Sequence, residues 1–338
     1  MDLAGHLRRL VAGTGAHALA AAEAEQLFGA MLDGAVAPLE LGAILAALRH
    51  KRESAAELTG FARALAARTL QIHLPPGAPR CAVIPSYAGS PHPPNLMPLL
   101  ALMLARHGVP VLIHSHGEAG RSPSLAVLNE LGVAPATSLA SAQSLLTGQG
   151  LAVLATEMLA PGLDNLLALR ERLPWRSSAH LAAKLLDPCP GRSLRMVCTA
   201  DPGLIDTMRE TLRQSSADAL LMRTPGDEAS ANPLRRPRIE HFVQGQASVL
   251  FEAESAPTAP AWPVPDPSDP HAMARWIAAV LEGRRAAPQP LLNQLSACLY
   301  ACGRAPDLNR AKAMVALGAA PLLRLPPATA AQPLLPAP

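Results

Sequence analysis

Aromatic residues are scarce in this chain of 338 residues: phenylalanine, tyrosine and tryptophan together make up 3% of the sequence. Proteins that hold single-stranded nucleic acid by base stacking need a platform of aromatic side chains. Tyr87, Trp175 and Phe242 are the few candidates for such a platform. The composition therefore argues against extensive base stacking, and any contact with nucleic acid would have to go mainly to the phosphate backbone.

Cysteine and long apolar runs are also limited. The five cysteines include no Cys-x-x-Cys pair, and no apolar run follows Arg8 and Arg9 near the amino terminus, so a secretory signal is not expected. The longest apolar stretch, residues 96–105, is too short to span a bilayer. We therefore expect a cytoplasmic protein that makes no membrane contact and whose cysteines are reduced core residues.

Lysine is nearly missing from the centre of the chain, since none lies between Lys51 and Lys184. Arginine carries almost all of the positive charge, and the net charge is +3 with a pI near 8.7. This mild excess permits contact with a polyanion without requiring it. This predominance of arginine over lysine would suit bidentate phosphate contacts. The alternative explanation for it is a coding bias that also enriches alanine and proline.

The amino-terminal part of the chain shows helical periodicity. Ala24, Leu27, Phe28 and Met31 form one apolar stripe, as in an amphipathic helix. Ser54, followed three residues later by a glutamate, has the pattern of a capping box that opens another helix. We expect a small all-helical domain over residues 1–74, followed by a proline-rich linker.

Short apolar runs alternate with helical segments from residue 80 onward, which is the signature of an α/β sheet. The predicted fold class is therefore α/β, with the small helical domain beside a larger α/β domain, residues 80–320, built on a mainly parallel central sheet. The tail, residues 321–338, is rich in proline and alanine and is expected to be disordered. The predicted strands are 81–84, 109–114, 151–154, 194–198 and 219–223, with 247–251 as an added edge strand.

The first two predicted strands and the helix between them indicate where a ligand would bind. In parallel sheets, ligands bind where loops leave the carboxyl ends of strands, which here are residues 85–94 and 114–121. A phosphate cradle needs glycines that turn several N–H groups inward, often with a lysine nearby. Residues 85–89, Pro-Ser-Tyr-Ala-Gly, provide only one glycine. The sequence thus predicts the architecture of a phosphate site without its usual ligands.

Two groups of residues could form a metal-ion site, and for each group an arrangement without metal is the alternative. Asp227 and Glu228 follow a predicted strand, where adjacent carboxylates could hold Mg²⁺ or form a solvated acidic turn. His114 and His116 alternate along a strand, but no third zinc ligand lies nearby. A histidine pair without metal is the favoured interpretation.

The densest basic cluster consists of Arg235, Arg236 and Arg238. Basic residues on one face would form a surface that follows the phosphates of nucleic acid, and ordinary solvated charge is an equally weighted alternative. Further basic residues surround another predicted strand and two helices: Arg192, Arg195, Lys184, Arg170, Arg172 and Arg176.

Several stretches resemble anthranilate phosphoribosyltransferases, which belong to glycosyl transferase family 3. The resemblance implies a helical domain completed by residues from about 160 to 190, beside an α/β domain of the kind also found in nucleoside phosphorylases. It also implies a homodimer formed through the helical domains. The stretches are residues 32–34, 38–43, 47–51, 56–60 and 117–132.

Enzymes of that family bind phosphoribosyl diphosphate with four short motifs, and three are altered here. Their Gly-Thr-Gly-Gly-Asp loop falls on residues 85–89, their Asn-x-Ser-Thr keeps only Asn95, and their Lys-His-Gly-Asn keeps only His114. The arginine that meets anthranilate falls on Arg170. The resemblance therefore implies a vestigial cleft with no catalytic residues. That cleft comprises Tyr87, Asn95, His114 and Arg170.

The departures themselves resemble the YbiB-like branch of this superfamily, in residues 85–87, 95–96, 98–102, 108–112, 178–180, 183–188 and 235–238. Members of this branch are associated with sequence-independent nucleic-acid binding by the dimer. The resemblance implies a non-enzymatic homodimer that binds DNA or RNA and needs no cofactor. The implied phosphate contacts are Arg235, Arg236 and Arg238 first, then Arg192, Arg195 and Lys184.

The fourth phosphoribosyl diphosphate motif is an acidic pair, which is kept intact here as Asp227 and Glu228. Its presence supports the alternative that the chain is an enzyme. Under this interpretation the chain is a Mg²⁺-dependent phosphoribosyltransferase. The acidic pair would hold the metal at the diphosphate, and Arg170 would steer anthranilate or another aromatic or nucleobase acceptor.

Overall fold

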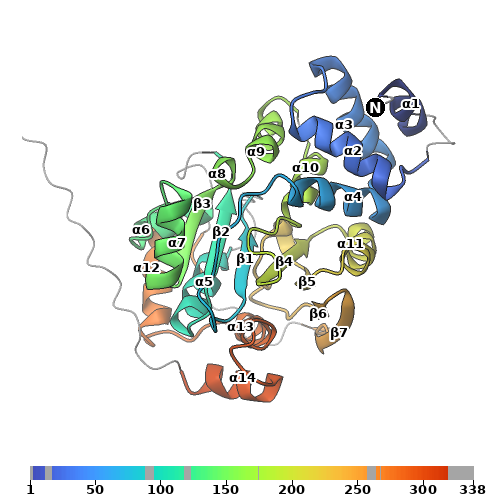
Figure 1. Ribbon diagram of the computed structural model, residues 1–338. Helices are drawn as coiled ribbons and strands as arrows, with labels where there is room; N and C mark the ends of the chain where they lie inside the picture. The colour runs from blue at the N-terminus through green and yellow to red at the C-terminus, as the bar shows by residue number, and fades with distance from the viewer. Residues whose placement is uncertain are drawn as a thin grey trace, which may run out of the picture.

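The amino-terminal helices form one lobe of the protein, at the upper right of Figure 1. The computed structural model describes residues 3–11, 17–87, 95–117, 123–173, 175–256, 264–266 and 268–318. The predicted capping box is confirmed, because Ser54 Oγ accepts from Glu57 N–H at 3.2 Å and Glu57 Oε2 accepts from Ser54 N–H at 2.8 Å. The helices are α1 (Leu3–Leu10), α2 (Ala21–Leu32), α3 (Pro38–Lys51) and α4 (Ala55–Ala66).

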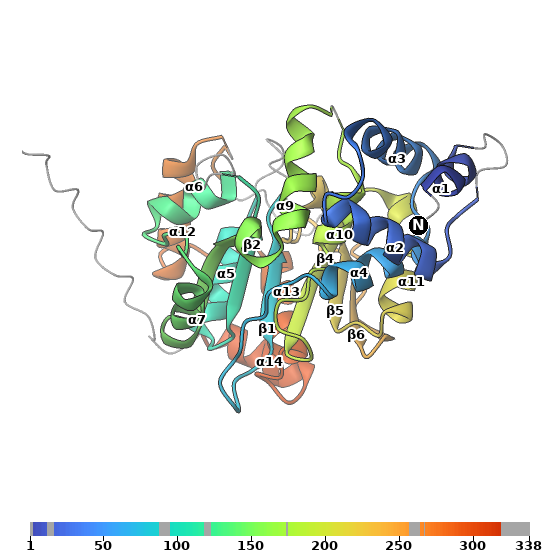
Figure 2. The same cartoon turned by 45° about the horizontal axis from the view of Figure 1, so that its top comes forward.

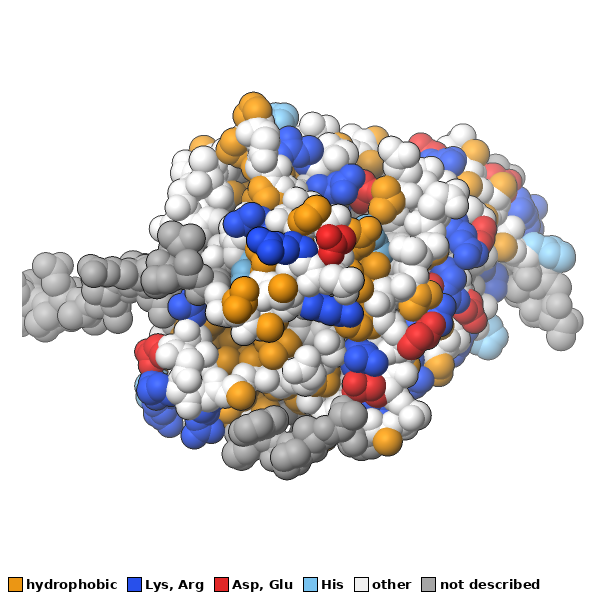
Figure 3. Space-filling view, turned by 90° about the horizontal axis from the view of Figure 1, so that it is seen from below, with side chains coloured by type: hydrophobic (Ala, Val, Ile, Leu, Met, Phe, Trp, Pro, Cys, Tyr) orange, Lys and Arg blue, Asp and Glu red, His pale blue; other side chains and the backbone are white. Residues whose placement is uncertain are grey.

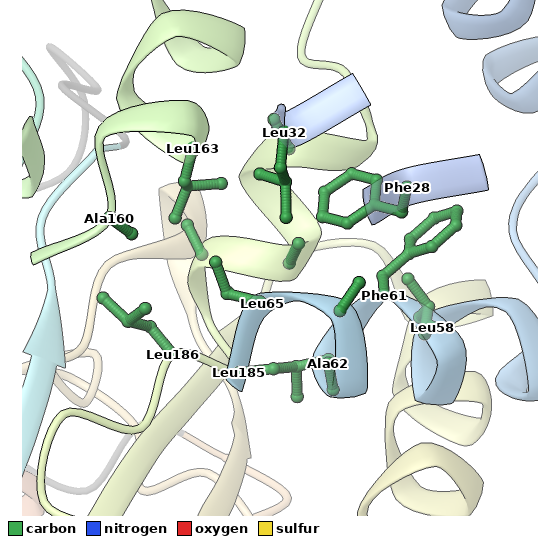
Figure 4. Close-up of a cluster of buried hydrophobic side chains, with 14 of the residues drawn as sticks. Phe28, Leu32, Leu58, Phe61, Ala62, Leu65, Ala160, Leu163, Leu185 and Leu186 are labelled. Atoms are coloured by element: carbon green, nitrogen blue, oxygen red, sulfur yellow. The ribbon is translucent and has the colours of Figure 1, made fainter. Parts of the chain in front are cut away.

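A later segment of the chain packs against these helices. In Figure 4, Leu163 of this segment, together with Leu185 and Leu186, lies around the buried face of α4. Phe28 of α2 stacks on Phe61 of α4 with ring centroids 4.4 Å apart, so one apolar core joins the two parts. The later segment comprises α8 (Thr156–Leu159), α9 (Pro161–Ala168), the 3-10 helix η2 (Leu169–Glu171) and α10 (Ser178–Ala183).

The second lobe is built on a seven-stranded sheet in the order β3-β2-β1-β4-β5-β6-β7. The first five strands are parallel, and β6 and β7 are added antiparallel at one edge. The predicted fold class is confirmed. The strands are β1 (Cys81–Pro85), β2 (Val111–Ser115), β3 (Leu151–Ala155), β4 (Ser193–Thr199), β5 (Ala219–Arg223), β6 (Ile239–Val243) and β7 (Gln246–Phe251).

Alternate side chains of the sheet enter two separate cores. Val83 and Leu112 point to the core shared with the helical lobe, α7 and α11, whereas Ile84 and Ile113 point to the core beneath α5, α6, α12 and α13. Both faces of the parallel strands are therefore covered, as Figure 2 shows. The remaining helices are α5 (Met97–Arg106), α6 (Pro123–Glu130), α7 (Leu139–Gly148), α11 (Pro202–Gln214), η3 (Pro225–Asp227), α12 (Pro270–Leu281), α13 (Gln289–Ala301) and α14 (Leu308–Ala316).

Strand β6 was not predicted from the sequence. Its apolar residues Ile239 and Phe242 flank Glu240 and His241, and all four are buried. The charge of Glu240 hides the strand pattern in the sequence, but Arg209 neutralises it by donating to both of its carboxylate oxygens at 2.7 Å. The predicted edge strand at 247–251 is present as β7.

The sequence also led to expectations about the cysteines, about membrane-spanning helices and about the carboxyl-terminal tail. All five cysteines are free and buried. None of the described helices is both long enough and apolar enough to cross a membrane. The tail, residues 321–338, lies outside the described residues.

Two glycines allow helix α2 to approach its neighbours closely. A Cβ atom on Gly60 of α4 would lie 2.3 Å from the carbonyl oxygen of Ala21, and one on Gly162 of α9 would lie 2.1 Å from that of Leu32. Real Cβ atoms are not found so close to backbone atoms. Only glycine therefore fits these helix crossings.

We predict that Gly60→Ala destabilises the protein by at least about 2 kcal/mol, because the added methyl group forces α2 and α4 apart. Gly42→Ala is the matched control: Gly42 lies in α3 with no atom within 4 Å of its Cβ position, and alanine there should stabilise the helix by about 0.5–1 kcal/mol. Urea denaturation measures both. Equal stability of the two variants would contradict the close packing.

Candidate cleft and basic edge

The carboxyl ends of β1, β4 and β5 meet the helical lobe at a cleft of about 130 Å³. The α3–α4 turn contributes Arg49, Arg52 and Glu53 to its lining, and α10 with its flanks contributes Arg176 and His180. The cleft thus lies where parallel sheets bind ligands, and both lobes form its walls. The other lining residues are Pro85, Tyr87, Ser177, Leu181, Lys184, Thr199, Asp201, Gly203, Leu204, Thr207 and Asp227.

Tyr87 and His114, two residues of the predicted vestigial cleft, bind each other. The Tyr87 hydroxyl lies 2.5 Å from His114 Nδ1 and 2.7 Å from Thr156 Oγ1. Burial raises the pKa of Tyr87 and lowers the pKa of His114 to about 3, so both side chains are neutral at physiological pH. An aromatic ring therefore stands in the loop after β1, and His114, the one residue of its predicted motif that is kept, is neutral beside it.

The other two residues of the predicted cleft have local partners. Asn95 Oδ1 accepts from Met97 N–H at 2.9 Å, and Asn95 Nδ2 donates to Ser124 Oγ, so Asn95 fixes the start of α5. Arg170 is exposed, and its Nη1 donates to the carbonyl of Leu173 at 3.0 Å.

Asp227 is paired with two cations. Arg176 Nη1 donates to one of its oxygens, Lys184 Nζ lies 3.4 Å from the other, and Ala200 N–H donates to it at 2.6 Å. Burial alone would raise the pKa of Asp227, but the charges of Lys184 and Arg176 and the Ala200 N–H outweigh it and lower the pKa. The neighbouring Glu228 is buried. Asp227 therefore neutralises protein cations in this structure.

Lys184 is buried, with 8% of its side chain exposed. Its ammonium donates to the carbonyl of Cys198 at 2.5 Å. Burial lowers the pKa of Lys184, and Asp227 partly opposes that shift. Lys184 thus lies inside the cleft wall and is unavailable to an external phosphate, contrary to its predicted role as a surface contact.

The predicted histidine pair is divided between two networks. His116 Nδ1 lies 2.8 Å from Asp164 Oδ1, whereas His114 faces Tyr87. Among the described residues, no group of three or more His, Cys, Asp or Glu is arranged to hold a metal ion.

Sequence analysis missed two titratable residues of the cleft. Burial raises the pKa of Glu53, even though Ser178 Oγ donates to its carboxylate at 2.5 Å. Burial, with the charges of Arg176 and Arg170, lowers the pKa of His180 to about 4. No motif identifies either residue, because their burial depends on the contact between the two lobes.

Arg52, also missed, has a backbone conformation that only glycine adopts readily, with φ 67° and ψ 140°. Its side chain is 69% exposed and crosses to the α/β lobe, where Nη2 lies 3.4 Å from Asp201 Oδ2. Nη1 lies 2.8 Å from the position of a Cβ on Gly203, in the first turn of α11. Such backbone strain costs about 1–3 kcal/mol, and it places the Arg52 guanidinium at the mouth of the cleft.

The predicted nucleic-acid contacts do not share one surface. Arg192 donates to the carbonyl of Ala78 at 2.6 Å near the amino end of β4. Arg195 is half-buried within β4 and points to the carbonyls of Leu185 and Asp218 at 3.4 Å each. Both arginines therefore bind the protein's own backbone, away from the carboxyl edge.

Two arginines of the densest cluster are held by carboxylates. Arg236 Nη1 lies 3.4 Å from Glu254 Oε1, and Arg238 Nη1 donates to Glu252 Oε2 at 2.7 Å. Arg235 is exposed and makes no ion pair within the described part of the chain. The acidic partners lie beyond β6 in sequence, so the cluster looked more strongly positive in the sequence than it is in the fold.

These arginines line a second hollow of about 590 Å³, on the other side of the start of α11 from the cleft. We call it the basic hollow; its five arginines are Arg209, Arg223, Arg235, Arg236 and Arg238. On the face seen in Figure 3, Lys and Arg side chains do not form one cluster but lie scattered among acidic, apolar and uncharged ones.

Comparisons with known proteins agree with this architecture. A model of the helical bundle domain of the glycosyl transferase family matches residues 5–69. The chain is 35% identical over 294 residues to the uncharacterised protein YbiB of Escherichia coli strain K12, covering 86% of this chain and 91% of that protein. It is 27% identical over 316 residues to the anthranilate phosphoribosyltransferase of Methanosphaerula palustris, covering 90% of each.

Solved structures show the same fold. Anthranilate phosphoribosyltransferase from Thermus thermophilus aligns with a TM-score of 0.72 over 93% of both chains, at 25% identity. The Saccharomyces cerevisiae enzyme in complex with PRPP and Mg aligns with a TM-score of 0.69 at 14% identity, over 93% of this chain and 92% of that one. The fold and the cleft thus define a phosphoribosyltransferase-like α/β protein. The chain belongs to the YbiB-like branch of the anthranilate phosphoribosyltransferase superfamily, glycosyl transferase family 3.

We predict that Arg52→Gly stabilises the protein by about 1 kcal/mol, because relief of backbone strain exceeds the loss of one exposed ion pair. Arg52→Ala is the control: it loses the same ion pair but keeps the strain, so it should be no more stable than the wild type. Chemical denaturation distinguishes the two. If both variants lose stability equally, the backbone at Arg52 is unstrained.

We predict that Asp227→Asn costs about 3 kcal/mol at neutral pH, because it leaves buried Lys184 without its carboxylate. The folded-state pKa of Asp227 is lowered, so its stabilisation is present above its unfolded pKa, about 4, and is lost as the pH falls through the folded value. The difference from wild type should therefore shrink in acid.

Glu252→Gln is the control for this measurement, because its carboxylate is 70% exposed in its pair with Arg238 and should contribute less than about 1 kcal/mol. Denaturant midpoints at several pH values give both comparisons. A constant difference between wild type and Asp227→Asn down to acid pH would show that Asp227 does not stabilise the fold through its charge.

Proposed function

We propose that this protein binds DNA or RNA without sequence preference, through phosphate contacts along the carboxyl edge of its sheet, and that it is not a phosphoribosyltransferase. One observation carries the proposal. Arg49, Arg170, Arg223 and Arg235 are exposed around this edge and make no ion pair within the described residues. Uncommitted guanidinium groups are suited to phosphate, and binding of this type releases counterions.

The contacts within the cleft support the second part of the proposal, that the protein is not a phosphoribosyltransferase. Transfer of a phosphoribosyl group requires that the diphosphate be neutralised by a metal, a lysine or a backbone cradle. Here Asp227 is committed to Arg176 and Lys184, and Tyr87 stands in the loop position where the related enzymes have glycines. A metal bound at Asp227 would compete with Arg176 and Lys184 for the same carboxylate.

We also propose that two copies associate through their helical lobes. The proposal follows from the resemblance to anthranilate phosphoribosyltransferases, and Leu39, near the start of α3, is an apolar side chain on this lobe that is 82% exposed. A dimer would present two basic edges to one strand of nucleic acid, so the linked sites would raise the overall affinity.

We predict that replacing Arg49, Arg223 and Arg235 with Ala weakens binding of an unstructured single-stranded oligonucleotide. The slope of log affinity against log salt should fall by about one unit for each lost phosphate contact. Because all three side chains are exposed, the melting temperature should change little. Fluorescence anisotropy at several salt concentrations measures the effect.

Arg275→Ala, on the exposed face of α12, serves as the matched control and should bind like wild type. If the triple variant binds as tightly as wild type at every salt concentration, these arginines are not the contact surface. Consumption of phosphoribosyl diphosphate with anthranilate and Mg²⁺ would instead establish the transferase alternative.

A further inference from the structure

The basic hollow differs from an extended surface that follows a nucleic-acid backbone, because its five arginines line a single concavity. Its volume of about 590 Å³ falls within the range of pockets that take a small molecule. Its arginines come from α11, the end of β5, and the segment that leads into β6, elements that lie side by side in Figure 1. The hollow lies outside the cleft where the related fold places its ligand.

Acidic residues fix three of the five arginines in place. Buried Glu240 accepts from Arg209 through two bonds of 2.7 Å and from Arg238 at 3.3 Å. Burial opposes ionisation of Glu240, but Arg209 and Arg238 outweigh it and lower its pKa. Arg236 lies over the ring of Phe251, 5.5 Å from its centroid. These guanidinium groups are therefore preorganised before any ligand arrives.

The other two arginines of the hollow have no acidic partner within the described residues. Arg223, the last residue of β5, is exposed, and its Nε points to the carbonyl of Ala200 at 3.4 Å. Arg235 is exposed; its backbone N–H donates to the carbonyl of Asn232 at 3.2 Å, and its guanidinium has no partner among the residues that the structure describes. The hollow thus combines three arginines that are held by neighbouring side chains with two, Arg223 and Arg235, whose charge no described carboxylate balances.

A doubly charged group matches two uncommitted charges better than a phosphodiester does. An internal phosphate of nucleic acid carries one negative charge, whereas a terminal phosphomonoester carries about −1.5 to −2 near pH 7 and has three acceptor oxygens. Arginine pairs with such an oxyanion through two parallel N–H···O bonds. A strand end can also enter a hollow that the middle of a strand must pass over.

We propose that the basic hollow binds the terminal phosphomonoester of a nucleic-acid strand, with Arg223 and Arg235 as its ligands. This inference rests on the proposed nucleic-acid binding and adds a preference for phosphorylated ends. Arg223 and Arg235 meet interior phosphates when a strand has no end phosphate, as proposed above. When the strand carries one, that group occupies the hollow in their place.

The test compares short fluorescent oligonucleotides of one sequence that carry a 5′-phosphate, a 3′-phosphate or only hydroxyl ends. One phosphorylated form should bind the full chain about tenfold more tightly than the hydroxyl form, as expected for an added pair of charge-assisted hydrogen bonds. Arg223→Gln and Arg235→Gln should each reduce this preference, and the double variant should abolish it. Arg275→Gln, exposed on α12, should retain it.

The outcomes separate this inference from the function on which it rests. Equal affinity for all three oligonucleotides overturns the end site while leaving nucleic-acid binding intact, whereas no binding at low salt overturns both. Inorganic phosphate serves as a competitor: if it displaces the phosphorylated strand at concentrations equal to those of the strand itself, the hollow is a free-phosphate site and the strand-end assignment is wrong. A preference that survives the double variant places the end phosphate elsewhere.

Discussion

The ion pair between Lys184 and Asp227 joins the helical lobe to the sheet at the cleft, next to the apolar core that the two lobes share. Lys184 follows α10 of the helical lobe, and Asp227 follows β5 of the sheet. Because Lys184 is buried, its charge is costly without a carboxylate nearby, so the loop after β5 must bring Asp227 to it. Arg176 joins the same carboxylate from the helical lobe. One acidic side chain thereby holds three segments at the floor of the cleft.

This pairing also sets the electrostatics of the cleft in this phosphoribosyltransferase-like fold. The negative charge that a metal would need is already balanced by the protein's own cations. Beside β1 and β2, Tyr87 and His114 form a neutral hydrogen-bonded pair. Three exposed arginines make no ion pair within the described residues: Arg49 lines the cleft, and Arg223 and Arg235 line the basic hollow.

Local sequence patterns predicted most of the fold, because parallel strands buried on both faces read as continuous apolar runs. They missed β6, whose buried Glu240 is compatible with a strand only beside Arg209, 31 residues away in sequence. The site was harder to predict for the same reason. The arginines Arg236 and Arg238 looked like free positive charge until the β6–β7 hairpin placed carboxylates against them, and the strain at Arg52 has no sequence signal.

We propose that this fold binds nucleic acid at its edge rather than phosphoribosyl diphosphate in its cleft. The most direct measurement is the melting temperature of the wild-type protein with each ligand at low salt, since a ligand that binds only the folded state raises it. We predict a rise with single-stranded DNA or RNA and no change with phosphoribosyl diphosphate, Mg²⁺ and anthranilate. A rise with the latter and none with nucleic acid would contradict the account.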